Sequence, residues 1–127
     1  MKGIIYFTIL LISPFASADT GNETCKMGAL KATLECLAKK LEAAKDDLNS
    51  VLEMIQRERA EDKLFIRGFN NAQNKWKESL KSDCDSIYDL WRYGSVKNVK
   101  WMQCKIELTK QRIYFINKYY VTEAEGI

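Results

Sequence analysis

Hydrophobic side chains recur along most of the chain at alternating steps of three and four, the spacing that places them on one face of an α-helix. The first stripe consists of Leu34, Leu37, Leu41, Ala44, Leu48, Val51 and Ile55. The second consists of Phe65, Phe69, Ala72, Trp76, Leu80 and Cys84. The third, which is less regular, consists of Trp101, Cys104, Leu108, Ile113 and Ile116. No segment shows the period of two that is typical of strands, so the pattern predicts an all-α fold.

Polar segments separate the three stripes. Residues 57–63 are polar and form the expected turn between the first two helices. Residues 92–100 form the expected loop before the third helix, and Gly94 lies within it. Because a short turn between long helices makes them antiparallel neighbours, we expect a long antiparallel hairpin that turns near residue 60. The predicted fold is a small bundle of three to four helices.

The N-terminal residues have the pattern of a secretory signal. Lys2 precedes an unbroken apolar run over residues 3–12, Pro14 ends the run, and small residues follow at positions 16–18. The run is much shorter than the roughly 20 residues needed to span a bilayer, so we expect no stable membrane anchor. We therefore predict a signal peptide over residues 1–18, a single helical domain over residues 19–127, and a periplasmic or secreted protein.

Composition excludes several classes of function. The 127 residues contain no histidine, which rules out Ser-His-Asp and Cys-His catalysis and zinc sites with a histidine ligand. The 20 Lys and Arg residues against 17 Asp and Glu residues leave a formal charge of +3, too small to indicate a nucleic-acid partner. No pair of carboxylates lies in a stripe that suggests a catalytic cleft. We therefore expect no enzymatic activity, no cofactor and no metal.

The chain has four cysteines, Cys25, Cys36, Cys84 and Cys104. In a secreted protein, four cysteines predict two disulfides, whereas zinc ligands normally come as closely spaced pairs. Cys36 and Cys84 lie equally far from residue 60, so the expected hairpin places them opposite each other. This reasoning predicts a Cys36–Cys84 disulfide and, by elimination, a Cys25–Cys104 disulfide.

Short motifs accompany these cysteines in a fixed order. Asp47-Leu48-Asn49 lies in the first predicted helix, Gln73-x-x-Trp76 precedes Cys84, and Cys104-x-x-x-Leu108-Thr109-x-x-Arg112 lies in the third. Over residues 25–112 this ordered set resembles the LprI family of secreted and periplasmic lysozyme inhibitors. The resemblance implies a binding protein that inhibits lysozyme-type cell-wall hydrolases by occluding the active-site cleft, with lysozyme as the candidate protein partner.

Most of the motif residues have a structural interpretation. Trp76 and Leu108 continue apolar stripes and are expected in the core. A buried amide needs hydrogen-bond partners, so Asn49 and Gln73 are expected to satisfy backbone groups where helices cross. Arg112 is expected to pair with an acidic residue of the first helix. The motif residues that we interpret as structural are Leu48, Asn49, Gln73, Trp76, Leu108, Thr109 and Arg112.

The loop between the second and third helices has the chemistry best suited to a lysozyme cleft, where two carboxylates hydrolyse the glycan. Tyr93 suits a sugar-binding subsite, and Ser95 can donate a hydrogen bond. Lys97 or Lys100 can pair with a catalytic carboxylate. We therefore take these four residues as the candidate partner-binding site.

A second function remains open from sequence. Residues 42–62 carry a balance of four negative charges and residues 92–118 a balance of six positive charges, so the helices are expected to face each other or solvent. This division does not require a cationic partner such as an animal lysozyme. The alternative is a periplasmic interaction protein, such as an immunity or accessory protein, with the same fold and no lysozyme activity. The oligomeric state and the type of lysozyme do not follow from the pattern.

Overall fold

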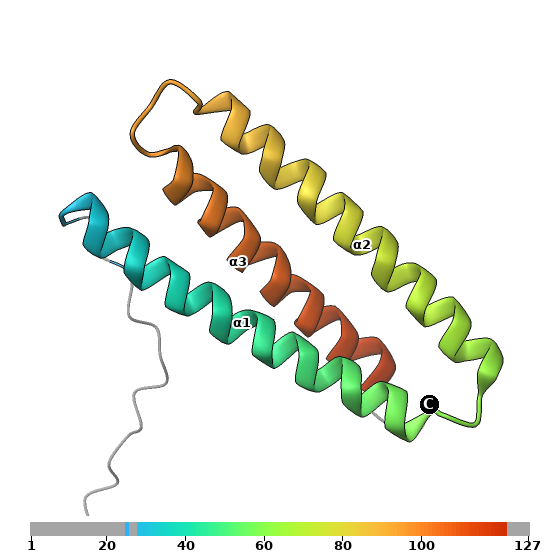
Figure 1. The fold of residues 1–127 in the computed structure, drawn as a ribbon. Coiled ribbons are helices and arrows are strands. Elements are labelled where there is room, and N and C mark those ends of the chain that lie inside the picture. The colour runs from blue at the N-terminus through green and yellow to red at the C-terminus, as the bar shows by residue number, and fades with distance from the viewer. Residues whose placement is uncertain (1–24, 26–27, 122–127) are drawn as a thin grey trace, which may run out of the picture.

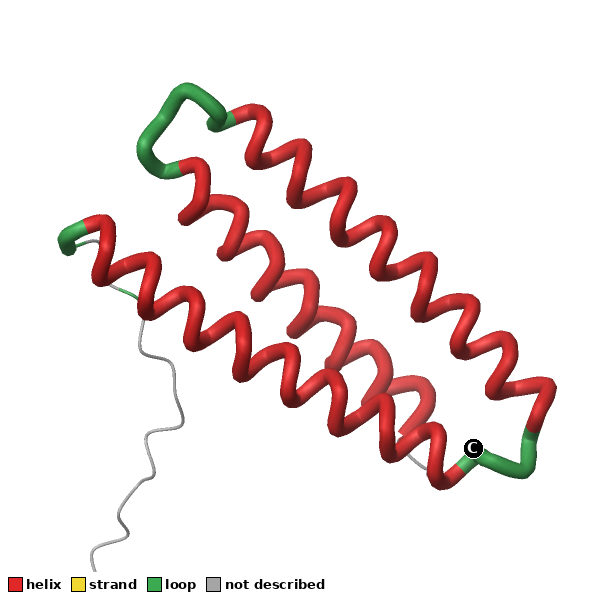
Figure 2. The backbone as a smooth tube through the Cα atoms, viewed as in Figure 1, coloured by secondary structure: helices red, strands yellow, loops and turns green. Residues whose placement is uncertain are grey.

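The computed structural model describes residue 25 and residues 28–121. These residues form three long helices, α1 (Leu30–Glu58), α2 (Lys63–Leu90) and α3 (Lys97–Ile116), and a final π-helical turn, η1 (Asn117–Val121) (Figure 1). The described residues contain no strand, which confirms the all-α prediction (Figure 2). The turn after the first helix is confirmed within two residues, whereas the loop before the third helix ends at Val96, four residues earlier than predicted, because Lys97–Lys100 form the first turn of α3. The expected signal peptide over residues 1–18 lies outside the described residues.

The helix ends follow from local hydrogen bonding. At the end of α1, the Arg59 amide donates to the Ile55 carbonyl at 3.0 Å. The chain then turns within four residues to Asp62, whose carboxylate accepts a hydrogen bond from the Phe65 amide at 3.0 Å. This is the usual role of an aspartate at a helix N-cap, where the first amides have no partner within the helix. The capped turn makes α1 and α2 antiparallel.

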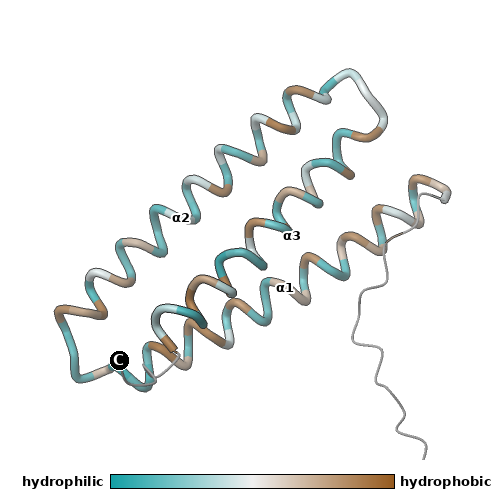
Figure 3. The backbone as a smooth tube through the Cα atoms, turned by 180° about the vertical axis from the view of Figure 1, so that it is seen from behind, coloured by the Kyte–Doolittle hydropathy of each residue, from teal (hydrophilic) through white to brown (hydrophobic). Residues whose placement is uncertain are grey.

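Helix α3 lies between α1 and α2 and is the main neighbour of both (Figure 1). Although α1 and α2 are joined by a tight turn, they make few direct contacts with each other. Each helix alternates between apolar and polar residues along its length, as Figure 3 shows from the opposite side. The amphipathic stripes of α1 and α2 are therefore buried chiefly against α3, and not against each other as a simple hairpin would require.

Most of the buried apolar residues of the described chain form two clusters. One, near the beginning of α1, joins Leu37 and Leu41 of α1 to Val99 and Ile106 of α3. The other, near the α1–α2 turn, draws on all three helices and consists of Leu48, Ile55, Phe69 and Ile116. The C-terminal half of α2, residues 77–90, therefore contributes no apolar residue to either cluster. This half of α2 depends on other contacts to stay on α3.

The disulfides supply one of those contacts, and the predicted pairing is wrong. Cys84 of α2 is bonded to Cys104 of α3, with Cα atoms 5.7 Å apart, and Cys25 is bonded to Cys36 with Cα atoms 5.8 Å apart. Both predicted links, Cys36–Cys84 and Cys25–Cys104, fail for one reason: α3 separates α1 from α2, so Cys36 and Cys84 do not meet. Two cysteines eleven positions apart in one helix would be about 16 Å apart, beyond the reach of a disulfide, but Cys25 precedes the start of α1 and is not held at that spacing.

Candidate functional site

The loop between α2 and α3, Trp91–Val96, forms the end of the bundle opposite the α1–α2 turn (Figure 1). Its backbone is held by short-range hydrogen bonds: the Trp91 amide donates to the Ile87 carbonyl at 3.2 Å, and the Gly94 amide donates to the Trp91 carbonyl at 2.8 Å. A Cβ atom at Gly94 would lie 3.4 Å from that same carbonyl, which is an ordinary van der Waals contact. The loop is therefore a compact turn that points its side chains outward.

Large apolar side chains are unusually exposed at this end. Tyr93 is 91% exposed, Leu90 is 74% exposed and Trp91 is 41% exposed. Neighbouring exposed apolar groups of this kind commonly mark interaction sites. We call this region the tip surface; it consists of Leu90, Trp91, Arg92, Tyr93, Ser95, Lys97 and Lys100.

Cations of the tip surface lie against aromatic rings. The Arg92 guanidinium lies 4.5 Å from the centre of the Tyr93 ring, and the Lys100 ammonium lies 5.3 Å from the Trp91 ring. The Lys97 ammonium lies 5.5 Å from the ring of Tyr88. Such contacts orient a cation without neutralising it. Within the described part of the chain, Arg92, Lys97 and Lys100 form no ion pair, so their charges can interact with an incoming carboxylate.

The structure brings the four predicted partner-binding residues to one end of the molecule. Tyr93, Ser95 and Lys100 are exposed, and Lys97 is half-buried. Sequence reasoning missed Leu90, Trp91 and Arg92, which share this surface. The pattern gave no signal for Leu90: it lies three residues after Ile87 and continues the apolar stripe of the second helix, which predicts burial, whereas the structure leaves it 74% exposed.

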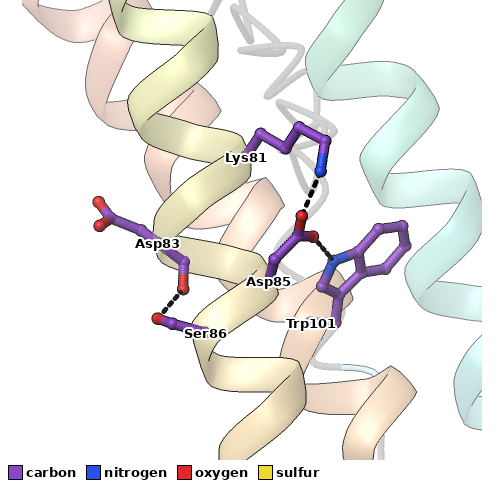
Figure 4. Close-up of polar contacts among 5 residues, drawn as sticks. All are labelled: Lys81, Asp83, Asp85, Ser86 and Trp101. Carbon is purple, nitrogen blue, oxygen red and sulfur yellow. Dashed lines mark hydrogen bonds and ion pairs between the residues drawn. The ribbon is translucent and has the colours of Figure 1, made fainter.

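A polar network holds α2 against α3 behind the tip surface (Figure 4). The Trp101 indole of α3 donates to Oδ1 of Asp85 at 3.2 Å, and the Lys81 ammonium pairs with Oδ2 of the same carboxylate. The hydrogen bond from Lys81, followed by that from Trp101, holds the pKa of Asp85 below its usual value. The network lies beside the Cys84–Cys104 disulfide, so together they fix the part of α2 that the apolar clusters leave unsupported.

This network predicts a pH-dependent stability. Because the folded-state pKa of Asp85 lies below the unfolded value, its contribution is complete above about pH 4 and is lost as the pH falls through the folded-state pKa. We expect Asp85→Asn to be less stable than the parent at neutral pH, with a difference that shrinks below about pH 4 in urea denaturation. Asp83→Asn is the matched control, because Asp83 points away from the network (Figure 4). A difference between Asp85→Asn and the parent that stayed constant with pH would contradict this assignment.

The motif residues occupy the middle of the bundle. The Arg112 Nε atom donates to Oε1 of Gln73 at 3.0 Å, and the Arg112 guanidinium lies 5.9 Å from the Trp76 ring and 5.7 Å from the Phe115 ring. The expected pairing of Arg112 with an acid of the first helix is therefore wrong, because Arg112 faces α2. Burial lowers the pKa of Arg112, and nearby Tyr120 partly offsets that effect.

The other motif residues divide between core and surface. Leu48, Gln73 and Thr109 are buried, and Trp76 and Leu108 are half-buried. Asn49 is exposed and not at a buried helix crossing as expected. The Nε2 atom of Gln73 is buried without a hydrogen-bond partner among the described residues. The Gln73 side chain therefore binds Arg112 through its oxygen alone.

Comparison with known families identifies the chain. The sequence profile of the family described as lysozyme inhibitor LprI matches residues 22–116. The chain belongs to the LprI family. The match runs from just before Cys25 to the end of α3, so it includes both disulfides, the motif residues and the tip surface. Comparison with curated proteins found no match, and comparison with solved structures found none either.

Within this LprI domain, the recurring motif and the exposed surface are separate. Gln73, Trp76 and Arg112 pack α2 against α3 in the middle of the bundle, while the tip surface lies at its end. No helix among the described residues is long and apolar enough to cross a membrane. The motif residues thus account for how α2 and α3 are held together, and the tip surface is exposed at the end of the bundle.

Proposed function

We propose that this LprI-family protein inhibits lysozyme-type cell-wall hydrolases by inserting its tip surface into the active-site cleft. One observation carries the proposal: Tyr93 is almost fully exposed beside cations that have no ion-pair partner in the described chain. The family description supplies the class of target. The protein acts as a binding partner of the hydrolase and not as an enzyme.

The chemistry of the tip surface matches that of a glycan-cleaving cleft. Such clefts hold two carboxylates that flank the scissile bond, together with subsites that accept sugar rings. Tyr93 supplies a flat ring for a sugar subsite. Lys97 and Lys100 supply ammonium groups for the carboxylates, and the Ser95 hydroxyl supplies a hydrogen-bond donor. These are the groups that a substrate-blocking loop needs.

The compact form of the loop favours tight binding. Association loses free energy when flexible loops and side chains become ordered, so a loop that is already ordered loses less. Here backbone hydrogen bonds close the turn, and the Arg92 and Lys100 side chains already lie against aromatic rings. The basic balance of residues 92–118 is local to α3 and the loop, so we expect binding to follow the charge of the cleft more than the overall charge of the hydrolase.

The proposal also places the protein outside the cytoplasm. Two disulfides in a chain of this size are typical of oxidising compartments, where lysozymes act. Cleavage of residues 1–18 by a signal peptidase remains a prediction. We propose a periplasmic or secreted location on these grounds.

The direct test is an inhibition assay with the oxidised protein, expressed from the full-length chain so that export and processing take place. The protein is titrated into lysozymes of different types while the lysis of a bacterial suspension is followed by turbidity. We expect lysis by at least one type to slow in proportion to the protein added, reaching saturation near one equivalent when binding is tight. No inhibition of any type at a large molar excess would refute the proposal and favour the alternative of an interaction protein without lysozyme activity.

A further inference from the structure

A groove runs between α1 and α2 midway along the bundle, with α3 as its floor. It encloses about 260 Å³. Its walls are apolar: Leu41 and Leu48 come from α1, and Trp76 and Leu80 come from α2. The floor at this level includes Thr109, a small residue that does not fill the space between the two outer helices. The groove exists because α1 and α2 make few contacts with each other and α3 presents short or polar side chains between them.

The rim of the groove is basic. Lys45 of α1, Lys77 of α2 and Lys105 of α3 all line it. Lys45 is paired with Glu42 at 2.9 Å, whereas Lys77 and Lys105 form no ion pair within the described residues. Each helix thus contributes one lysine: Lys77 has no ion-pair partner among the described residues, and Lys105 has only the more distant Asp85 as a countercharge.

Lys105 is held in position beside the groove. Its ammonium lies 3.6 Å from the centre of the Trp101 ring, and Trp101 is itself fixed by its hydrogen bond to Asp85. Lys81, Asp85 and Trp101 lie on the side of α2 and α3 that faces α1, as Figure 4 shows. Burial, together with the positive charge of Lys45, lowers the pKa of Lys105. An anion placed between Lys77 and Lys105 would relieve this unfavourable environment.

We propose that the groove binds an anionic amphiphile with a single alkyl chain, of which a fatty-acid carboxylate is the simplest example. The alkyl chain lies between the leucines and Trp76, and the carboxylate lies at Lys77 and Lys105. Leu41 and Leu48 are two turns apart on α1, about 10 Å, which suits a chain of medium length.

The size of the groove favours a small ligand over a protein segment. Its volume of about 260 Å³ is slightly below the roughly 300–1,000 Å³ that is usual for small-molecule sites. A helix with its side chains is about 10–12 Å across and does not fit such a space. The apolar walls select an alkyl chain, and the lysines select an anion over a cation or a neutral head group. This site lies in the middle of the bundle, away from the tip surface, and does not depend on the proposed inhibition.

Isothermal titration of the oxidised protein with sodium dodecanoate, kept below its micelle-forming concentration, tests the proposal. We expect one molecule bound per chain, with an affinity at least tenfold higher than for dodecyltrimethylammonium or dodecanol. The tryptophan fluorescence of the parent protein is expected to change over the same concentration range, because Trp76 lines the groove. Raising the salt concentration is expected to weaken binding of dodecanoate but not of dodecanol.

Two variants locate the head group. Lys77→Gln/Lys105→Gln is expected to lower the dodecanoate affinity at least tenfold, whereas Lys75→Gln, which removes an exposed charge outside the groove, leaves it within twofold. Should the double variant fail to fold, Lys77→Gln alone tests the proposal, because Lys77 is exposed and its replacement is not expected to disturb folding. We expect this single variant to bind dodecanoate at least threefold more weakly than the parent. Equal affinity for the cationic amphiphile, binding of several molecules per chain, or unchanged affinity in the Lys77 variant would each overturn the proposal. Lys77→Gln is expected to inhibit lysozyme as well as the parent does. Failure of the groove proposal can therefore be distinguished from failure of the proposed inhibition by the tip surface.

Discussion

Replacement of Tyr93, Ser95, Lys97 and Lys100 by alanine is expected to raise the concentration needed for half-maximal lysozyme inhibition at least ~30-fold. That factor corresponds to about 2 kcal/mol, the loss typical of a binding hot spot. The substitutions remove the exposed ring and two charges without touching either apolar cluster. The thermal unfolding midpoint is therefore expected to stay near that of the parent. The measurement is the turbidity assay, using whichever lysozyme the parent protein inhibits.

The far end of the bundle offers a matched control for this experiment. Lys118 lies 5.2 Å from the ring of Tyr119, and Tyr119 is 62% exposed, so the pair resembles the cation and ring of the tip. Lys118→Ala/Tyr119→Ala should leave inhibition unchanged, whereas Tyr93→Ala/Lys100→Ala should weaken it. If the two double variants lost inhibition equally, or if the four tip substitutions had no effect, the tip surface would not be the inhibitory site.

The helices and their ends follow closely from local pattern. The apolar stripe from Leu34 to Ile55 is recovered as α1, and the polar stretch that follows it is recovered as the turn capped by Asp62. These features depend on residues close in sequence: the period of the stripe, the side chain that caps the helix, and the absence of proline. Local chemistry of this kind can be interpreted without knowledge of the tertiary fold.

The way in which the helices pack does not follow from the stripes. A stripe shows which face of a helix is buried but not which helix covers it. The hairpin model paired the first two helices, whereas α3 lies between them and takes up both faces. The same error produced the wrong disulfides, because the equal distance of Cys36 and Cys84 from residue 60 matters only if α1 and α2 touch. It also misplaced the partner of Arg112, which faces Gln73.

The candidate site divides in a similar way. Tyr93, Ser95, Lys97 and Lys100 were accessible to prediction because a loop between helices is exposed wherever the helices pack. The groove could not be predicted from the sequence, since Lys45, Lys77 and Lys105 come from three helices and have no recognisable spacing along the chain. Their convergence is a consequence of packing alone.

Loss of the Cys84–Cys104 disulfide is expected to lower the free energy of unfolding by about 3 kcal/mol, the loop-closure value for a 20-residue separation. The C-terminal half of α2 contributes almost nothing to the apolar clusters, so this link and the Asp85 network hold it on α3. We therefore expect Cys84→Ala/Cys104→Ala to free the tip surface from its fixed position and to weaken inhibition as well. Urea denaturation gives the stability, and the turbidity assay gives the inhibition.

The second disulfide provides the comparison. Cys25→Ala/Cys36→Ala opens a shorter, 11-residue loop next to the beginning of α1, where Leu37 and Leu41 already pack on α3. Its loss is expected to destabilise the protein slightly less and to leave inhibition unchanged, because the tip surface is held by the other link. If removing Cys84–Cys104 changed stability by less than about 1 kcal/mol, or if peptide mapping linked Cys36 to Cys84, this account of how α2 is held would be wrong. Because inhibition separates the two variants even where their stabilities are similar, it is the more decisive of the two measurements.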